Sequence, residues 1–376
     1  MPDNLPLSLL KIRSSMEDFI ASNLSLESDE LEFSDGRRRD IITASKAAGF
    51  YYKTQSQEFG GQPANLLELT MLREQLAATN SIYARFVFGP GPGVLHQARG
   101  KLKQDYLDPL MRGEKQMAFG FTEPEDADRP TFAVLDNSHL TLTGRKSYVT
   151  EGASADFISV LVNLEDTIGK KLGTLMVVVD KDAQGVSIEN AFTSLDGGAH
   201  LAMGFDAVQV PVDNMVGKPG EGMPRALKNI ADVRLMVAAE SIGICLWVLA
   251  YLEKKLTAKH RSGHALADRE GVRLRYADLR IETYVGRSVL YRTARLAIGK
   301  ENSVNEISAC KIYCTELAGR VVDQAVQLSG GQALITGHPL EKLYRQVRSL
   351  RFVEGANDLL RLNIAKGKFD LGLGKL

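Results

Sequence analysis

The chain has 376 residues, of which 44% are hydrophobic and 24% are charged, a balance typical of soluble globular proteins. Basic and acidic residues number 46 each, so no net charge attracts the chain to nucleic acid or to an anionic membrane. We therefore expect no nucleic-acid partner, and the length indicates two or three domains rather than one core.

Residues 1–117 have the pattern of a helical domain. Apolar residues recur at three- and four-residue spacing near the start, at Leu9, Ile12, Met16 and Phe19. Gly49 follows the next periodic run and suits the end of a helix. Because Glu17 and Asp18 interrupt the N-terminal stretch, it does not have the composition of a secretory signal peptide.

Residues 118–222 have a different pattern, with short runs rich in Val, Thr, Ile and Phe such as TFAVL, HLTLTG and TLMVVVD. Clusters of Asn, Asp, Gly and Pro separate these runs, which predicts a compact antiparallel β domain, a small barrel. No helix of useful length fits between the runs. The Gly-x-Gly-x-x-Gly fingerprint is also missing, which argues against a βαβ dinucleotide fold.

Residues 223–376 return to a helical pattern. One apolar stripe contains Ile307, Cys310, Cys314, Leu317, Val321, Ala325 and Leu328, and another contains Leu274, Ile281, Val285, Val289 and Leu296. Both stripes predict core-facing helices of an antiparallel four-helix bundle. The predicted fold class is therefore mainly α with a central β domain, in the order helical domain, β-barrel domain and helical bundle.

The apolar run 235–252 is the only stretch that resembles a membrane span. Because it contains Glu240 and follows Arg234, we interpret it as a buried bundle helix and expect no membrane span. The three cysteines, Cys245, Cys310 and Cys314, do not form a disulfide framework and suit a reducing compartment, so we expect a cytoplasmic protein. We also expect no metal site, because a glycine and a serine interrupt the spacing of His260, His264 and Asp268.

Glu354 stands in the run FVEGAND, directly before Gly355. A solvent-exposed glutamate needs no such neighbour. An acid that stays partly dry, where the backbone comes close to a ligand, would benefit from apolar Phe352 and Val353 on one side and glycine on the other.

Five segments, in order, resemble the acyl-CoA dehydrogenases, the FAD-containing family that desaturates acyl thioesters. They are MAFGFTEP, GRKSYVTEGASADF, FDAVQVPVDNMVGKPGEGM, VRLMVAAESIG and the C-terminal run from VQLSGG to NIAKG. Each segment alone is a weak signal. Together they cover most of the chain and match its helical, β and helical regions, so the resemblance implies this fold and an FAD cofactor.

The resemblance implies which residues contact the flavin. Phe119, Phe121 and Thr122 match positions that face the ring, Tyr148 matches an aromatic that covers it, and Thr150 matches a hydroxyl near its N5 atom. A flat redox-active ring needs an aromatic wall and a few fixed polar groups at its heteroatoms. Without the resemblance, Tyr148 and Thr150 would be ordinary strand residues.

The resemblance also implies contacts to the rest of FAD. Gln327, Gly330 and Gly331 match a segment that approaches the adenosine and pyrophosphate from a neighbouring subunit, so we expect a homo-oligomer, either a tetramer or a dimer. Judged by residue type alone, an ordinary glycine turn explains them equally well. Lys259 or Arg261 would bring a cation to the pyrophosphate, where the family has Arg-x-x-Phe-Gly and this chain has KHRSG.

Glu354 takes the place of the family's general base, which precedes glycine and threonine. The implied reaction is removal of an α-proton by Glu354 while flavin N5 accepts the β-hydride. A second lineage of the family has its base directly before the arginine that here is Arg234. That position is Val233, which cannot accept a proton. Two further departures, Glu270 and Ala356, change expected contacts to FAD.

The substrate implied by the resemblance is an acyl thioester of CoA or of a carrier protein, as in fatty acid metabolism. The electron acceptor would be an electron-transferring flavoprotein or oxygen. Two alternatives remain open: a flavin oxidase or monooxygenase with the same fold, and a non-catalytic subunit of a hetero-oligomer. The stripe Arg345, Arg348 and Arg351 is either a solvated or subunit-facing helix side or a phosphate contact.

Overall fold

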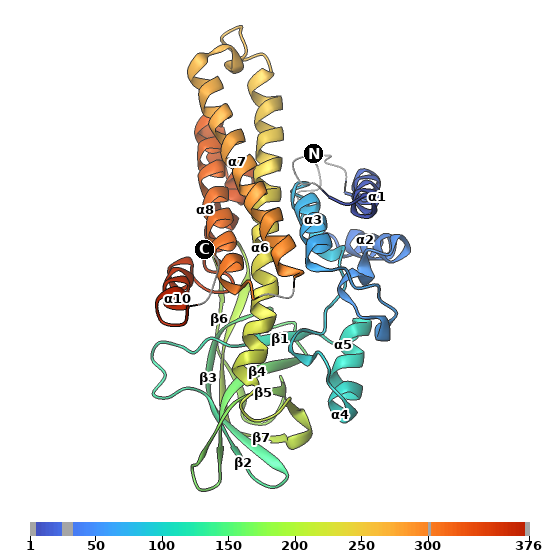
Figure 1. The fold of residues 1–376 in the computed structure, drawn as a ribbon, viewed down its shortest axis with the longest axis vertical. Coiled ribbons are helices and arrows are strands. Elements are labelled where there is room, and N and C mark those ends of the chain that lie inside the picture. The colour runs from blue at the N-terminus through green and yellow to red at the C-terminus, as the bar shows by residue number, and fades with distance from the viewer. Residues whose placement is uncertain (1–4, 25–32, 300–301, 373–376) are drawn as a thin grey trace. The chain divides into compact units, whose positions relative to one another are not determined.

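The computed structural model describes residues 5–24, 33–299 and 302–372 (Figure 1). The chain forms two compact units. Unit 1 comprises Met1–Lys53, Gln62–Phe88 and Ala231–Leu376, and unit 2 comprises Thr54–Gly61 and Gly89–Ile230. The N-terminal helices therefore share a unit with the C-terminal bundle, and the three domains predicted at 1–117, 118–222 and 223–376 stay a prediction.

Unit 2 contains an eight-stranded sheet with the order β6-β7-β3-β2-β4-β5-β8, and β1 pairs with β4. The strands are β1 Met117–Gly120, β2 Phe132–Leu135, β3 His139–Thr150, β4 Phe157–Asp166, β5 Lys171–Asp180, β6 Val186–Thr193, β7 Ala199–Pro211 and β8 Met215–Val216. The central β domain is thus confirmed. The sheet is mixed, because β2 pairs antiparallel with β3 and parallel with β4. Over these strands it is open and does not close into the predicted barrel, since β6 and β8 lie at its two ends.

Strand β5 shows how unit 2 is packed. Five consecutive residues, Leu175 to Val179, are buried. Alternate side chains of this run join two different apolar clusters. One cluster is formed by residues of the strands themselves, and the other packs against the segment with α4 Gly100–Leu102 and α5 Asp108–Arg112. A strand covered on both faces has a continuous apolar run, which is why TLMVVVD does not alternate.

Unit 1 consists of helices around one apolar core. They are α1 Leu7–Asn23, α2 Asp35–Ala48, α3 Leu66–Ala77, α7 Glu270–Ala297, α8 Val304–Ser329, α9 Pro339–Ser349 and α10 Asn357–Phe369, with most of α6 Gly222–Thr257. Gly49 ends α2 with φ +80°, as its sequence position predicts. Buried Glu74 of α3 accepts hydrogen bonds from Arg287 Nε and Tyr291 Oη of α7, each at 2.6 Å.

Of the two predicted apolar stripes, the one on α8 is confirmed, because its residues from Ile307 to Ala325 are buried. The prediction for α7 is wrong for three of its five residues: Leu274, Ile281 and Val285 are 61%, 60% and 40% exposed, whereas Val289 packs against the core. The buried side of α7 carries Gly286, where a Cβ would lie 2.5 Å from Leu317 Cδ2. The same side carries Leu279, Leu290 and Tyr291, so α7 turns a different face toward the core than the predicted stripe.

Helix α6 is, among the described residues, long and apolar enough to cross a membrane by length and composition. Two-thirds of its most apolar window, 67%, is buried within the fold. Leu235, Ile242 and Leu252 are fully buried in the core of unit 1. These contacts agree with the interpretation of this run as a core helix of the bundle.

Candidate active site

Glu354 lies in the turn between α9 and α10, in unit 1. Its φ is +56°, which is uncommon for a residue other than glycine, and the φ of Gly355 is +103°. The turn is closed by hydrogen bonds from Gly355 N to Phe352 O, at 3.1 Å, and from Asn357 N to Arg351 O, at 3.0 Å. Glycine after Glu354 therefore serves a backbone conformation that other residues rarely adopt.

Arg234 of α6 holds the backbone of this turn. Its Nε donates a hydrogen bond of 2.9 Å to Glu354 O, and its side chain is 9% exposed. Burial lowers the pKa of Arg234, and the charge of Glu354 opposes that change. A second atom, Nη2, would lie 3.4 Å from a Cβ at Gly355, so the guanidinium packs directly against the turn.

Lys311 of α8 holds the same turn from another helix. Its Nζ donates to Gly355 O at 2.9 Å, to Asn357 Oδ1 at 2.9 Å and to Arg351 O at 3.2 Å. The side chain has no exposed surface. Burial lowers the pKa of Lys311 to about 8, and the charge of Arg234 acts in the same direction.

The carboxylate of Glu354 is half-buried. Burial raises the pKa of Glu354, while the charges of Arg234 and then Lys311 lower it. The sequence suggested that Phe352 and Val353 keep this acid dry, but they are 59% and 38% exposed. The elements that surround the acid come instead from α6 and α8, far away in the sequence.

The other expected flavin contacts lie in unit 2. The rings of Phe119 and Phe121, at the end of β1, are stacked with centroids 5.7 Å apart and planes inclined by 16°. Ser147 N donates a 2.9 Å hydrogen bond to Thr122 O, which joins this segment to the end of β3. Buried Lys146 donates to Phe121 O at 3.2 Å and forms a short ion pair with Glu123.

Tyr148 is a second residue in a rare backbone conformation, with φ +54°. It lies at a register shift of β3 between Lys146 and Val149, and its side chain is 62% exposed. Among the described residues, its aromatic neighbours are Phe192 and His200, both edge-on to it. Their ring centroids lie 5.3 Å and 6.1 Å from that of Tyr148. A bulge that turns a large ring outward suits the cover of a flat ligand.

His200 is a polar neighbour of the site that the sequence did not reveal. Its Nδ1 lies 3.1 Å from Thr150 Oγ1 and its Nε2 lies 3.0 Å from Ser194 Oγ. The Ser194 hydroxyl also lies within hydrogen-bond distance of Asp196 Oδ1 and of Gly198 O. These contacts join Thr150, at the end of β3, to the turn between β6 and β7.

The residues expected at the adenosine and pyrophosphate lie elsewhere in unit 1. Lys259 and Arg261 are exposed in the loop after α6, and Gln327 is exposed near the end of α8. A Cβ at Gly330, whose φ is +77°, or at Gly331 would meet no atom within 4 Å. Both glycines therefore leave the backbone open to an approaching group.

These groups and Glu354 lie at different ends of the bundle. Tyr251 Oη lies 3.3 Å from His338 Nε2, so the end of α6 and the start of α9 are together. Arg234, which contacts the Glu354 turn, precedes Thr257 by a helix rise of roughly 35 Å. A single chain thus does not bring Lys259, Arg261, Gln327 and the two glycines to its own Glu354.

Two family models match this chain. The model described as acyl-CoA dehydrogenase, N-terminal domain, matches residues 8–114, and acyl-CoA dehydrogenase, C-terminal domain, matches residues 220–369. Together they cover more than half of the sequence. The chain belongs to the acyl-CoA dehydrogenase family. It is therefore an oxidoreductase of a family that acts on CH–CH groups.

Named relatives agree with this family. The caffeyl-CoA reductase–Etf complex subunit CarC of Acetobacterium woodii is 26% identical over 94% of this chain and 96% of its own length. The short-chain specific acyl-CoA dehydrogenase of Clostridium acetobutylicum is 27% identical over 82% of this chain and 84% of its own.

A solved structure shows the same fold. Glutaryl-CoA dehydrogenase of Mycobacterium smegmatis, in complex with FADH2, has a TM-score of 0.81 and 18% identity, and covers 99% of this chain and 97% of its own. The expected cofactor, FAD, is the cofactor of the acyl-CoA dehydrogenase family. In unit 2, exposed Tyr148 fits the face of a flat ring, and in unit 1 the open backbone at Gly330 and Gly331 fits an anionic group.

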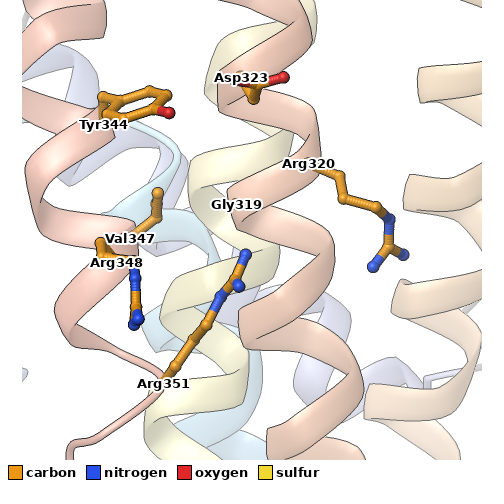
Figure 2. Close-up of a pocket in the computed structure, with 7 residues that line it drawn as sticks. All are labelled: Gly319, Arg320, Asp323, Tyr344, Val347, Arg348 and Arg351. Atoms are coloured by element: carbon orange, nitrogen blue, oxygen red, sulfur yellow. The ribbon is translucent and has the colours of Figure 1, made fainter.

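A cavity of about 280 Å³ between α8 and α9 adjoins the Glu354 turn (Figure 2). It is lined by Gly319, Arg320, Asp323, Tyr344, Val347, Arg348 and Arg351. Arg351 reaches toward Gly319, whereas Arg320 points away and pairs with Glu282 at 2.9 Å. Arg345 pairs with Glu341 at 2.8 Å, so only two residues of the predicted arginine stripe line this cavity.

No group of three or more His, Cys, Asp or Glu side chains placed to bind a metal ion occurs among the described residues. His260 Nδ1 lies 3.0 Å from Ser262 Oγ, and Asp268 accepts a 3.1 Å bond from Ala265 N. These are local contacts of an exposed loop.

Proposed function

We propose that this chain is an FAD-dependent acyl thioester dehydrogenase in which Glu354 is the general base. The observation that carries the proposal is the Glu354 turn, an acid in a rare conformation whose backbone is bound by buried Arg234 and Lys311. Burial raises the pKa of Glu354, which strengthens it as a base, while the charges of Arg234 and Lys311 oppose that rise.

In the proposed reaction, bound FAD supplies the acceptor for the β-hydride. The residues that would hold and cover its ring are Phe119, Phe121, Thr122, Tyr148 and Thr150. Glu354 takes the α-proton onto a carboxylate oxygen, and the product is a trans-2-enoyl thioester. Since the elimination is reversible, protonated Glu354 returns the same proton when the enzyme works as a reductase, the activity named in the relative from Acetobacterium woodii.

The backbone of Glu354 has a part in this reaction. The N–H groups of Val353 and Gly355 donate to backbone carbonyls at 3.3 and 3.1 Å, whereas that of Glu354 donates to no backbone carbonyl in the described part of the chain. The left-handed conformation thus leaves one donor beside the carboxylate. We assign it to the thioester carbonyl, where a hydrogen bond stabilises negative charge as the α-proton leaves.

We further propose a homo-oligomer, a tetramer or a dimer, in which Lys259, Arg261 and the Gln327–Gly331 segment contact FAD of a second copy. The roughly 35 Å between the two ends of the bundle requires this arrangement if these residues contact the cofactor. The exposed stripe on α7 suits such an interface, because apolar faces of this kind are rarely left in water. The molar mass from light scattering tests the oligomer.

The proposed partners follow from the same chemistry. The substrate is an acyl thioester of CoA or of a carrier protein, in fatty acid metabolism, and the compartment is the cytoplasm. We assign electron transfer to an electron-transferring flavoprotein rather than to oxygen, since a similar protein is a subunit of an Etf complex. Comparing reoxidation of the thioester-reduced enzyme by the flavoprotein and by oxygen tests this assignment.

Anaerobic titration with acyl thioesters tests the function. Wild-type protein should bleach its bound flavin, and Glu354→Gln should fold, stay yellow and lose about 10²–10⁴-fold in the bleaching rate. Glu282→Gln, which removes an exposed carboxylate paired with Arg320, is the control and should bleach at the wild-type rate. Bleaching by no thioester would favour the oxidase or monooxygenase alternative, and a colourless protein that cannot take up FAD would favour a non-catalytic subunit.

A further inference from the structure

Lys311 is a buried charge that takes no step of its own in the proposed reaction. Its side chain has no exposed surface, and its three hydrogen-bond acceptors are neutral oxygens. Among the described residues, no carboxylate oxygen lies within 4.0 Å of its Nζ, the distance of an ion pair. A buried lysine without a direct counter-ion is costly, so its position calls for a function.

All three acceptors of Lys311 belong to the segment that carries Glu354. Arg351 O precedes the acid, and Gly355 O and Asn357 Oδ1 follow it, so one ammonium group brackets the turn. Asn357 also donates to Thr315 Oγ1 and to Glu316 Oε1, each at 3.1 Å. The side of α8 from Lys311 to Glu316 thus determines where the turn lies.

Two helices of unit 1 bring charge to Glu354. Arg234 on α6 and Lys311 on α8 act on Glu354 with positive charge. Glu316 on α8 is already paired with Arg361 of α10, with Nη2 2.8 Å from Oε1. Lys311 therefore has Glu354 as the nearby acid whose charge is not committed to another ion pair.

We propose that Lys311 is a positioning residue, which holds the Glu354 turn through three hydrogen bonds and keeps the Glu354 carboxylate ionised through its charge. This proposal rests on the proposed role of Glu354 as the general base. Because one ammonium group supplies both effects, removing its charge should change the titration of Glu354 even where the turn survives.

The test compares Lys311→Met, which removes charge and donors, Lys311→Gln, which keeps an N–H donor, and Lys311→Arg, which keeps the charge. Two readouts follow Glu354 as pH is varied. One is the infrared band of its protonated carboxyl group in the absence of substrate, identified by its loss in Glu354→Gln. The other is the acid limb of the rate of flavin bleaching. Lys53→Met, which removes a lysine paired with Glu68 elsewhere in unit 1, controls for general loss of stability.

Both neutral variants should move the infrared titration and the acid limb upward by about one pH unit, or about 10-fold in rate below the limb, since an opposite charge nearby favours the ionised acid. Lys311→Arg should bring both back toward wild type, and Lys53→Met should leave both in place. If Lys311→Met does not fold, Lys311→Gln is used for both measurements.

An unchanged infrared titration in both neutral variants would overturn the proposal. That result is distinct from failure of the proposed function, which would appear as a wild-type bleaching rate in Glu354→Gln. The infrared titration does not depend on the reaction, so it decides the role of Lys311 in either case.

Discussion

Two buried lysines, one in each unit, show different ways of holding a backbone segment. Lys146 of unit 2 donates to Phe121 O and forms an ion pair with Glu123, so its charge is compensated directly. Lys311 of unit 1 donates only to neutral oxygens. Burial lowers the pKa of both lysines, and for Lys146 the paired Glu123 opposes that change.

The difference suggests two roles: the charge of Lys146 stabilises the fold, whereas the charge of Lys311 can act on the proposed general base. Lys146 and Glu123 neutralise each other at the end of the β1 segment, where the proposed function needs only a rigid wall for a ring. Lys311 has its charge uncommitted, beside an acid that must lose and gain a proton. A cation without a fixed partner influences that acid, whereas a paired cation does not.

The largest expected effect breaks the ion pair. Lys146→Met should lower the free energy of unfolding by about 3 kcal/mol, the low end of the range for removing one partner of a buried pair. The low end applies because Glu123 is 30% exposed and keeps a 2.9 Å hydrogen bond from Thr131 Oγ1. Denaturant unfolding measures this loss, and a cost below about 1 kcal/mol would mean that the pair is not structural.

A smaller effect is expected at the turn that Lys311 holds. Gly355→Ala should cost about 1–3 kcal/mol in the free energy of unfolding, because φ at this position is +103°. A Cβ there would meet its nearest atoms at 3.4 and 3.5 Å, so strain and not collision is the cause. The rate of flavin bleaching should also fall, up to about 100-fold, through displacement of Glu354.

Gly271→Ala is the matched control for that variant. Gly271 lies in α7, and a Cβ there meets nothing within 4 Å. This change should be neutral or should stabilise the chain by about 0.5–1 kcal/mol. Equal stability changes in the two variants would contradict the strain assigned to the Glu354 turn.

The smallest expected effect is a dependence of stability on pH. The pKa of Lys311 is about 8 in the fold and 10.5 unfolded, so between these values the unfolded chain binds more protons and stability rises with pH. From pH 7.5 to 9.5 the wild-type protein should gain about 1–2 kcal/mol relative to Lys311→Met. Parallel pH profiles of unfolding would show that Lys311 is not a buried charge.

The helices illustrate what the sequence can predict about this fold. Periodicity identified the apolar faces of α7 and α8 equally well, yet only the face of α8 is buried. A period of three to four residues shows that one face of a helix is apolar. It does not show which surface of the protein, if any, covers that face. The buried side of α7 is instead the one with Leu279, Gly286 and Leu290, and a single glycine in a helical pattern does not signal a contact site.

The part of the candidate site that the sequence could indicate is the one whose residues are neighbours in the chain. Glu354 and Gly355 stand out because a glycine beside an acid lets the backbone come close to a ligand, and the structure adds that both residues have a positive φ. Lys311 and His200 were missed because their partners are distant in the chain. The only local signal for Lys311 is a lysine between Cys310 and Ile312, which are both buried.

His200 had still less of a signal. It meets Thr150 through the pairing of β3 with β7, whose register shifts twice along the strands. A shift of one residue sends every following side chain to the other face, so the pairing could not be read from the strand pattern. Contacts across strands with bulges therefore have to come from the structure.

The central claim is that this chain removes an α-proton from a thioester as its flavin is reduced. The most direct measurement is the rate of anaerobic flavin bleaching with a thioester deuterated at the α-carbon, compared with the same thioester unlabelled. The account predicts that α-deuteration slows bleaching several-fold in the wild-type protein. Bleaching at the same rate with both substrates would contradict it.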